Sequence, residues 1–164
     1  MLIRASKRLA PYRSWRMINL RKVRDLDLAV ASASGRPPHL SAASGLVCLN
    51  SFTYVIADDE LHLAVFRTDT AEPGHLIRLF EGTLPGSASA RKRQKPDLEA
   101  LSLLPPSMDY HHGALLILGS GSRPNRRTGA IIGLDAQGAT QGSPQVVDLS
   151  AIFDALDGLY QSSY

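Results

Sequence analysis

Eight short apolar runs separated by turn residues constrain the fold of this 164-residue chain more than any other feature. Gly, Pro, Asn, Asp and Ser cluster between the runs, which is the pattern of short β-strands joined by turns. No helical apolar period is present before residues 149–159, where we expect one short helix. The runs form two sets of four: 45–49, 53–57, 61–66 and 75–80, then 98–104, 113–118, 128–134 and 145–149. The sequence therefore predicts an all-β fold.

The two sets of runs align with each other as an internal repeat. The alignment pairs 46–49 with 100–103, 54–57 with 116–119, 63–66 with 130–133 and 76–79 with 145–148. Four antiparallel strands per repeat are typical of β-propeller blades. We predict an incomplete β-propeller: two four-stranded antiparallel blades, at about 41–81 and 97–150, after an N-terminal strand within 18–23 or 26–30.

A propeller typically closes with about 4–8 blades, and each blade buries its faces against its neighbours. Two blades leave outer faces and edges uncovered. Three expectations follow. The chain pairs with another chain that covers these faces, or it is a truncated product, or it folds as a smaller two-sheet structure. Between the two repeats, residues 82–96 are rich in Gly, Pro and basic residues, and we predict a loop there.

Charge divides the chain into a basic N-terminal arm, residues 1–24, and a single β domain, residues 25–164. The arm holds eight basic and no acidic residues, whereas the remainder holds 10 basic against 15 acidic. Such an arm can bind an acidic partner. We nevertheless expect no nucleic acid, because zinc-knuckle cysteines and an aromatic-rich basic strand are both missing. A solvated basic segment is the simpler interpretation.

Three absences bear on location. No run approaches the roughly 20 apolar residues of a membrane helix, so we expect no membrane insertion. Arg4 interrupts the apolar start, which argues against a secretory signal. The single cysteine, Cys48, excludes an internal disulfide and lies in an apolar run, where we predict a buried structural thiol. Together these features favour a cytoplasmic protein.

The second repeat carries a family resemblance. Residues 95–101 (KPDLEAL) and 113–122 (GALLILGSGS) are similar to a family of uncharacterised bacterial β-propeller proteins. They resemble more distantly the phytase-like and esterase-like propellers, in which an Asp-x-Glu-Gly/Ala segment opens a blade. Residues 44–46 and 54–59 match in the first repeat, so the likeness covers about 40–135. It implies a propeller fold, and it raises the expectation of a metal-dependent hydrolase.

Acidic residues are the first candidate site. Strand alternation places Asp97 and Glu99 on one side of a strand, where carboxylates suit a hard cation such as Ca²⁺. Because Ca²⁺ takes 6–8 oxygen ligands, other residues must contribute, and Asp58 is the third candidate ligand. The alternatives are structural. Glu99 bonds backbone or an arginine between blades, and Asp58 serves the geometry of a hairpin turn.

A Gly/Ser loop with three arginines is the second candidate site. Ser120, Ser122, Arg123, Arg126 and Arg127 follow a strand and offer donors for an anion or phosphate. The spacing is not that of a nucleophile elbow, because the G-x-S-x-G pattern and its following helix are missing. A wide turn between strands is the structural alternative.

Two functions remain open at this point. The first is a non-enzymatic propeller used for binding or scaffolding, which needs no catalytic residues. The second is a phytase-like or esterase-like hydrolase, dependent on a metal such as calcium, that acts on an acidic or phosphorylated small molecule. The second would assign Asp97 and Glu99 to the metal and the arginines to the substrate anion. The sequence assigns no catalytic residue.

Overall fold

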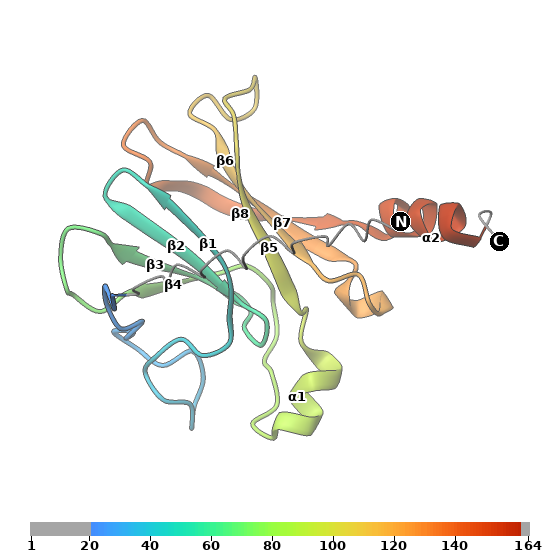
Figure 1. The fold of residues 1–164 in the computed structure, drawn as a ribbon, viewed down its shortest axis with the longest axis horizontal. Helices are drawn as coiled ribbons and strands as arrows, with labels where there is room; N and C mark the ends of the chain where they lie inside the picture. The colour runs from blue at the N-terminus through green and yellow to red at the C-terminus, as the bar shows by residue number, and fades with distance from the viewer. Residues whose placement is uncertain (1–20, 162–164) are drawn as a thin grey trace, which may run out of the picture.

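The computed structural model describes residues 21–161, which form two stacked four-stranded antiparallel sheets (Figure 1). The first sheet has the order β1-β2-β3-β4 and the second β5-β6-β7-β8. The strands are β1 (Ala43–Leu49), β2 (Phe52–Ala57), β3 (His62–Arg67), β4 (His75–Arg78), β5 (Leu98–Leu104), β6 (Ala114–Gly119), β7 (Thr128–Leu134) and β8 (Thr140–Asp148). All eight predicted strands are confirmed, and the fold is all-β in its main elements. Neither sheet closes on itself within the described chain.

Three short helical segments connect or follow the strands: α1 (Ala88–Gln94), the 3₁₀ turn Pro124–Arg126 and α2 (Ser150–Gln161). The predicted helix at 149–159 is confirmed as α2, which extends away from the sheets (Figure 1). With 12 residues α2 is the longest described helix, and none of the described helices could cross a membrane.

The prediction of a loop throughout 82–96 is wrong for α1. Ser87 caps this helix by accepting a hydrogen bond from the backbone N–H of Ala90. Its Ala, Arg, Lys and Gln residues are strong helix formers. A seven-residue helix with no buried side chain carries no apolar period, so a periodicity search overlooks it.

The predicted N-terminal strand is not found within residues 21–42. This segment makes only two isolated bridges, Asp27 with His39 and Leu28 with Gly74. Its apolar residues Leu26, Leu28 and Leu40 instead cover one side of the first sheet, around Phe66. Residues 1–20, which hold most of the basic arm and the start of the alternative strand at 18–23, lie outside the described residues.

The main core lies between the two sheets. The first sheet contributes Tyr54, Ile56, Leu63 and Val65, and the second contributes Leu115, Ile117, Ala130 and Ile132. All eight are at most 3% exposed, and each large side chain contributes about 1.5–3 kcal/mol by leaving water. The Tyr54 hydroxyl also donates a 2.5 Å hydrogen bond to the carbonyl of Gly138, which ties the first sheet to the β7–β8 turn.

The two sheets share a feature of strand pairing that makes their positions comparable. The β1–β2 register shifts between Ala43 and Gly45, and the β5–β6 register shifts between Leu98 and Ala100. The residues that precede β1 and β5, Ala42 and Asp97, both have positive φ, 54° and 57°. When the two sheets are aligned on these register shifts, Tyr54 in β2 corresponds to Leu116 in β6, as the sequence alignment predicts. The pairings of β1, β3 and β4 with their counterparts are each one residue away from that alignment.

Corresponding positions face opposite ways relative to the core. The first sheet turns Tyr54 and Ile56 toward the second sheet, whereas the second turns Leu115 and Ile117 toward the first. The two sheets therefore contact each other through sides that do not correspond in the repeat. The side of the second sheet that corresponds to the buried side of the first points away from the core. We call this side the outer face. Its large apolar residues, all half-buried, are Leu116, Leu118, Ile131 and Val147, and it includes the uncharged residues that lie between them.

The predicted burial of Cys48 is wrong. This thiol is exposed and lies 3.6 Å from the hydroxyl of Thr53 on the paired strand. It belongs to β1, an edge strand, and its neighbours Val47 and Leu49 pack on the core. Alternation along the strand directs Cys48 to the opposite side, where the covering segment 26–40 packs on other strands.

Candidate functional site

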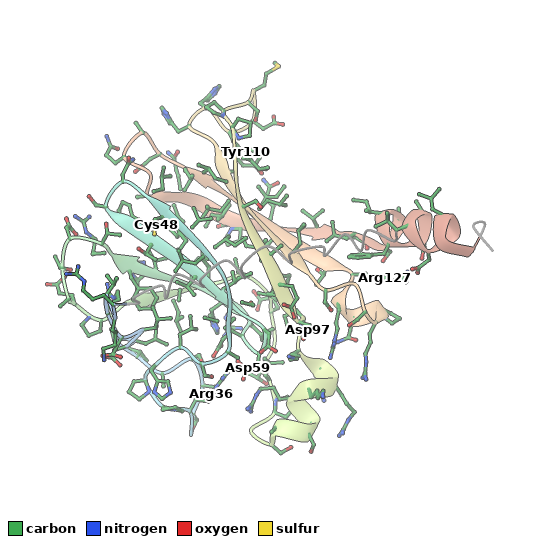
Figure 2. The ribbon with its side chains drawn as sticks, in the orientation of Figure 1. Arg36, Cys48, Asp59, Asp97, Tyr110 and Arg127 are labelled. Atoms are coloured by element: carbon green, nitrogen blue, oxygen red, sulfur yellow. The ribbon has the colours of Figure 1, made fainter. Side chains whose placement is uncertain are left out.

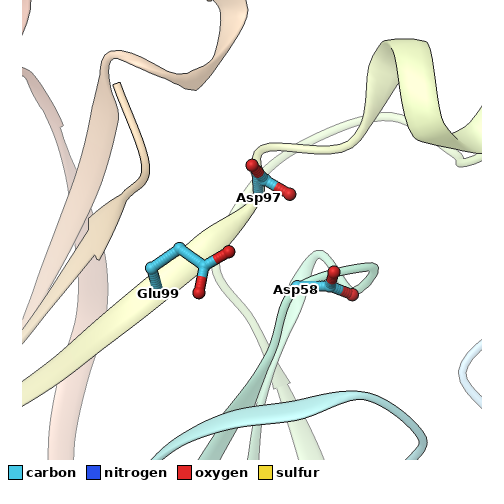
Figure 3. Close-up of side chains that lie close together, drawn as sticks. All are labelled: Asp58, Asp97 and Glu99. Carbon is cyan, nitrogen blue, oxygen red and sulfur yellow. The ribbon is translucent and has the colours of Figure 1, made fainter. Parts of the chain in front are cut away.

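Three carboxylates meet where the β2–β3 turn of the first sheet approaches the start of β5 (Figure 3). Asp58 lies in the turn, Asp97 precedes β5 and Glu99 lies within β5. One oxygen from each lies within 4.8 Å of the others. The structure thus brings together the residues that the sequence nominates for a metal. Close packing of the two sheets, with β5 beside β1 and β2, creates this juxtaposition.

Asp97 lies outside strand β5, so the strand alternation that predicts one shared side for Asp97 and Glu99 does not apply to it. Asp97 has a φ of 57°, outside strand conformation, and the register shift between Leu98 and Ala100 follows it. Asp97 is buried, whereas Glu99 is exposed. Glu99 makes no hydrogen bond or ion pair with the described residues. It therefore does not serve as the arginine or backbone partner that its structural alternative requires.

Lys95 occupies the space between two of the carboxylates. Its ammonium group pairs with Asp58 and, at 2.7 Å, with Asp97. The Lys95 side chain is only 11% exposed. Burial lowers the pKa of Lys95, but its hydrogen bonds to Asp58 and Asp97 outweigh burial and hold the pKa above its ordinary value. The lysine stays charged, so it supplies the positive charge that a metal would otherwise supply.

Asp97 is neutralised from its other side by Arg126. The guanidinium Nη1 lies 2.6 Å from Asp97 Oδ2, and the Ser120 hydroxyl donates to the same oxygen at 2.7 Å. Burial raises the pKa of Asp97, but the bonds from Lys95 and Ser120 and the nearby charges of Lys95 and Arg126 outweigh it. The pKa therefore lies below its ordinary value, and Asp97 is a carboxylate held by two cations.

The five residues nominated for an anion do not converge on one site. Ser120, Ser122 and Arg126 gather around Asp97, with Arg126 also donating to the Ser122 hydroxyl at 2.9 Å. Arg127 instead pairs with Asp154 and Asp157 of α2 (Figure 2). Arg123 is exposed and has no ion-pair partner among the described residues. Two of the three arginines in this loop are therefore paired with carboxylates of the same chain.

A second charged cluster, whose basic members Arg36 and Arg91 no sequence motif signals, adjoins the first. Asp59 accepts hydrogen bonds from Arg36 at 2.9 Å and from Arg91 at 3.1 Å, and Arg36 also pairs with Glu60 at 2.6 Å. Arg36, Asp59 and Asp97 lie at one end of the sheets, beside α1 (Figure 2). The turn geometry expected for Asp58 is present too, since the N–H of Glu60 donates to the carbonyl of Ala57.

The cluster of Asp58, Asp97 and Glu99 meets only part of what a hard cation requires. Carboxylate oxygens are the donors that Ca²⁺ prefers, but Ca²⁺ takes 6–8 of them at about 2.3–2.6 Å. Asp58 and Asp97 are already bonded to Lys95, so a cation must displace the ammonium group to reach them. The described residues that would hold a calcium ion are Asp58, Asp97 and Glu99.

Comparison with known proteins identifies a family for this chain. Residues 39–163 match a family of unknown function (DUF6929), which is more than half of the chain. No curated protein and no solved structure is similar to it. Any function must therefore be inferred from the residues themselves.

Proposed function

Because the chain belongs to the DUF6929 family, whose function is unknown, we propose from its own geometry that it is a β-propeller-type binding or scaffold module. Its two sheets act as blade-like repeats, and its outer face pairs with another chain. A cytoplasmic location and a single β domain over 25–164 complete this proposal as predictions from the sequence.

The outer face is the observation that carries the proposal. An antiparallel sheet that faces water alternates apolar and polar residues, with its polar side chains outward. The outer face instead presents Leu116, Leu118, Ile131 and Val147, and the residues paired beside them on β5 and β8, Ala100, Ser102 and Gln145, are uncharged. The corresponding side of the first sheet is buried against its neighbour. A face of this kind is completed by another sheet.

We take a second copy of this chain as the partner. The paired positions at the centre of the outer face are uncharged, so two copies can meet through them without electrostatic repulsion. Such a contact is isologous, with the same patch on both copies, and it forms a closed dimer. The opposite side of the first sheet does not compete, because Leu28 and Leu40 already cover it.

Neighbouring valines on β8 provide a matched test. Val147 lies on the outer face, whereas Val146 is 60% exposed on the other side of the same strand. Sedimentation across the micromolar to millimolar range should show a concentration-dependent dimer for the wild type and for Val146→Glu. Val147→Glu should remain a monomer. A monomeric wild type at every concentration, or equal loss of dimer in both variants, would contradict the proposal.

The metal-dependent hydrolase is the second candidate, supported by the convergence of Asp58, Asp97 and Glu99. The bonds of Lys95 to two of these carboxylates count against it. Thermal unfolding in EDTA and in added Ca²⁺ separates the two functions. We expect no Ca²⁺-dependent shift in melting temperature. A shift that is present in the wild type and lost in Glu99→Gln would favour the hydrolase.

A further inference from the structure

A small cavity lies at the end of the first sheet, against the charged cluster of Asp59 and Glu60. It has a volume of about 70 Å³. One water requires about 10–15 Å³, so the cavity is several times larger than a single-water site. It is far smaller than drug-sized sites, which have volumes of several hundred Å³. Its apolar wall includes Leu61, Leu84 and Pro85, and its polar wall includes Ser32, Glu60, His62 and three arginines. The size suits one carboxylate or phosphate group.

The charges around this cavity do not cancel. Arg36 and Arg91 are matched by Asp59 and Glu60, to which they are bonded. Burial raises the pKa of Glu60, but the neighbouring His62, Ser32 and Arg36 outweigh it and hold the pKa below its ordinary value. Glu60 is therefore ionised and already compensated by Arg36. The remaining wall residue with a permanent charge is Arg78, and it is a cation.

Arg78 has donors to spare. Its Nη1 donates to the carbonyls of Phe80 at 3.2 Å and Gly82 at 2.9 Å, and it has no carboxylate partner among the described residues. These backbone bonds hold the guanidinium group at the cavity while its other N–H groups remain available. A planar guanidinium with free donors is a strong recognition group for carboxylate and phosphate oxygens.

His62 provides a second, independent observation. Its residue is 9% exposed and lines the same cavity, yet its Nδ1 has no hydrogen-bond partner and lies 3.5 Å from Glu60 Oε2. The contact with Glu60 is longer than an ordinary N–H···O hydrogen bond, so the imidazole is only partly engaged by its neighbour. Ser32, His62 and Arg78 also line an adjoining groove of about 430 Å³ along β4, which gives the cavity an approach from solvent.

From these observations we propose that the cavity binds a small oxyanion, a carboxylate or phosphate group, through Arg78 and His62. This inference is independent of the proposed dimer. It also places anion binding away from the Gly/Ser loop, whose cations Arg126 and Arg127 are engaged with carboxylates. Carboxylate and phosphate share the required chemistry, so two probes distinguish between them.

Amide chemical shifts measured during titration test the proposal. Acetate and inorganic phosphate are added separately to the full chain at constant ionic strength. We expect saturable shifts at Gly82 and Thr83 with at least one probe, and the probe that binds more tightly identifies the group. Arg78→Gln should weaken binding about tenfold, the effect of losing one charged hydrogen bond.

Arg93→Gln is the matched control. Arg93 is an exposed arginine on α1 that does not line the cavity, so the variant changes the net charge equally. It should bind as the wild type does, and melting curves should show both variants folded. Failure of both probes to give saturable shifts, or equal weakening in the two variants, would overturn the proposal.

Discussion

Asp97→Asn isolates the charge of one buried carboxylate from every other property of its position. Asn has the same shape as Asp, and it tolerates the left-handed conformation that a φ of 57° requires. The substitution removes the ion pairs with Lys95 and Arg126. Lys95 keeps Asp58 as a partner, whereas Arg126 is left without a carboxylate among the described residues.

The expected loss follows from the burial of these partners. The side chains of Asp97 and Lys95 are each 11% exposed, and that of Arg126 is 9% exposed. Breaking a buried pair by removing one partner costs about 3–5 kcal/mol. Because Lys95 retains Asp58, we expect the lower end, about 3 kcal/mol. For a chain of this size, that loss lowers the melting temperature by about 9 °C.

The lowered pKa of Asp97 predicts how the loss of stability in Asp97→Asn changes with pH. The pKa of Asp97 is depressed in the folded chain, so its stabilisation is complete above the unfolded pKa of about 3.9. It disappears as the pH falls through the lower, folded pKa. Urea unfolding should therefore show a large gap between wild type and Asp97→Asn at pH near 7 and a shrinking gap below pH about 4.

Glu99→Gln is the control for this experiment. It removes an exposed carboxylate two residues away that has no partner among the described residues, so its effect should stay within about 0.5 kcal/mol. If Asp97→Asn loses no more stability than Glu99→Gln, the ionic cluster does not stabilise the fold. A gap that persists unchanged into acid would likewise refute the assignment of the loss to the charge of Asp97.

Three further predictions concern packing and exposure. Burial and the charge of Asp135 raise the pKa of Tyr54 to about 12, so spectrophotometric titration should show a late-ionising tyrosine that Tyr54→Phe removes; an unchanged titration would refute this. Gly74→Ala places a methyl group 2.5 Å from the Phe66 ring and should cost about 1–3 kcal/mol in urea unfolding, whereas Gly86→Ala, with open space around it, should be neutral. Cys48 should react with a thiol reagent in the folded chain nearly as fast as in urea, and strong protection would contradict its exposure.

The strands could be predicted from the sequence because local rules determine them. Runs such as Tyr54–Ala57 combine β-branched and aromatic residues, and turn residues such as Asp58 and Asp59 separate them. The helix α1 could not be predicted from apolar periodicity, because none of its seven residues is buried and it therefore has no apolar pattern.

The orientation of the sheets could not be predicted, because the side-chain period of a strand is two. A register change of one residue moves every side chain to the other face. The sequence alignment pairs Leu63 with Ala130, whereas the strand registers pair Ala64 with Ala130. With Leu63 paired to Ala130, the alignment places Ala130 on the same side of the sheet as Leu116, whereas the strand registers place it on the opposite side.

The sequence predicts the acidic members of the charged site and Arg126, but not the other basic members. Asp58, Asp97 and Glu99 follow from residue type and from their places in a turn and at the start of a strand. The bonds of Asp59 to Arg36 and Arg91 join residues 23 and 32 positions apart, and no local pattern signals them. Lys95 lies in the segment predicted as a loop, yet it is 9% exposed and bonded to two carboxylates.

Cross-saturation NMR on a mixture of deuterated, methyl-labelled chains and protonated chains tests the central claim, that the outer face binds a second copy. Only contacts between copies transfer saturation in such a mixture. We predict attenuation of the methyl signals of Leu116, Leu118, Ile131 and Val147, with the Val146 methyls unaffected. Attenuation confined to other residues, or none at concentrations where the chain is dimeric, would contradict the account.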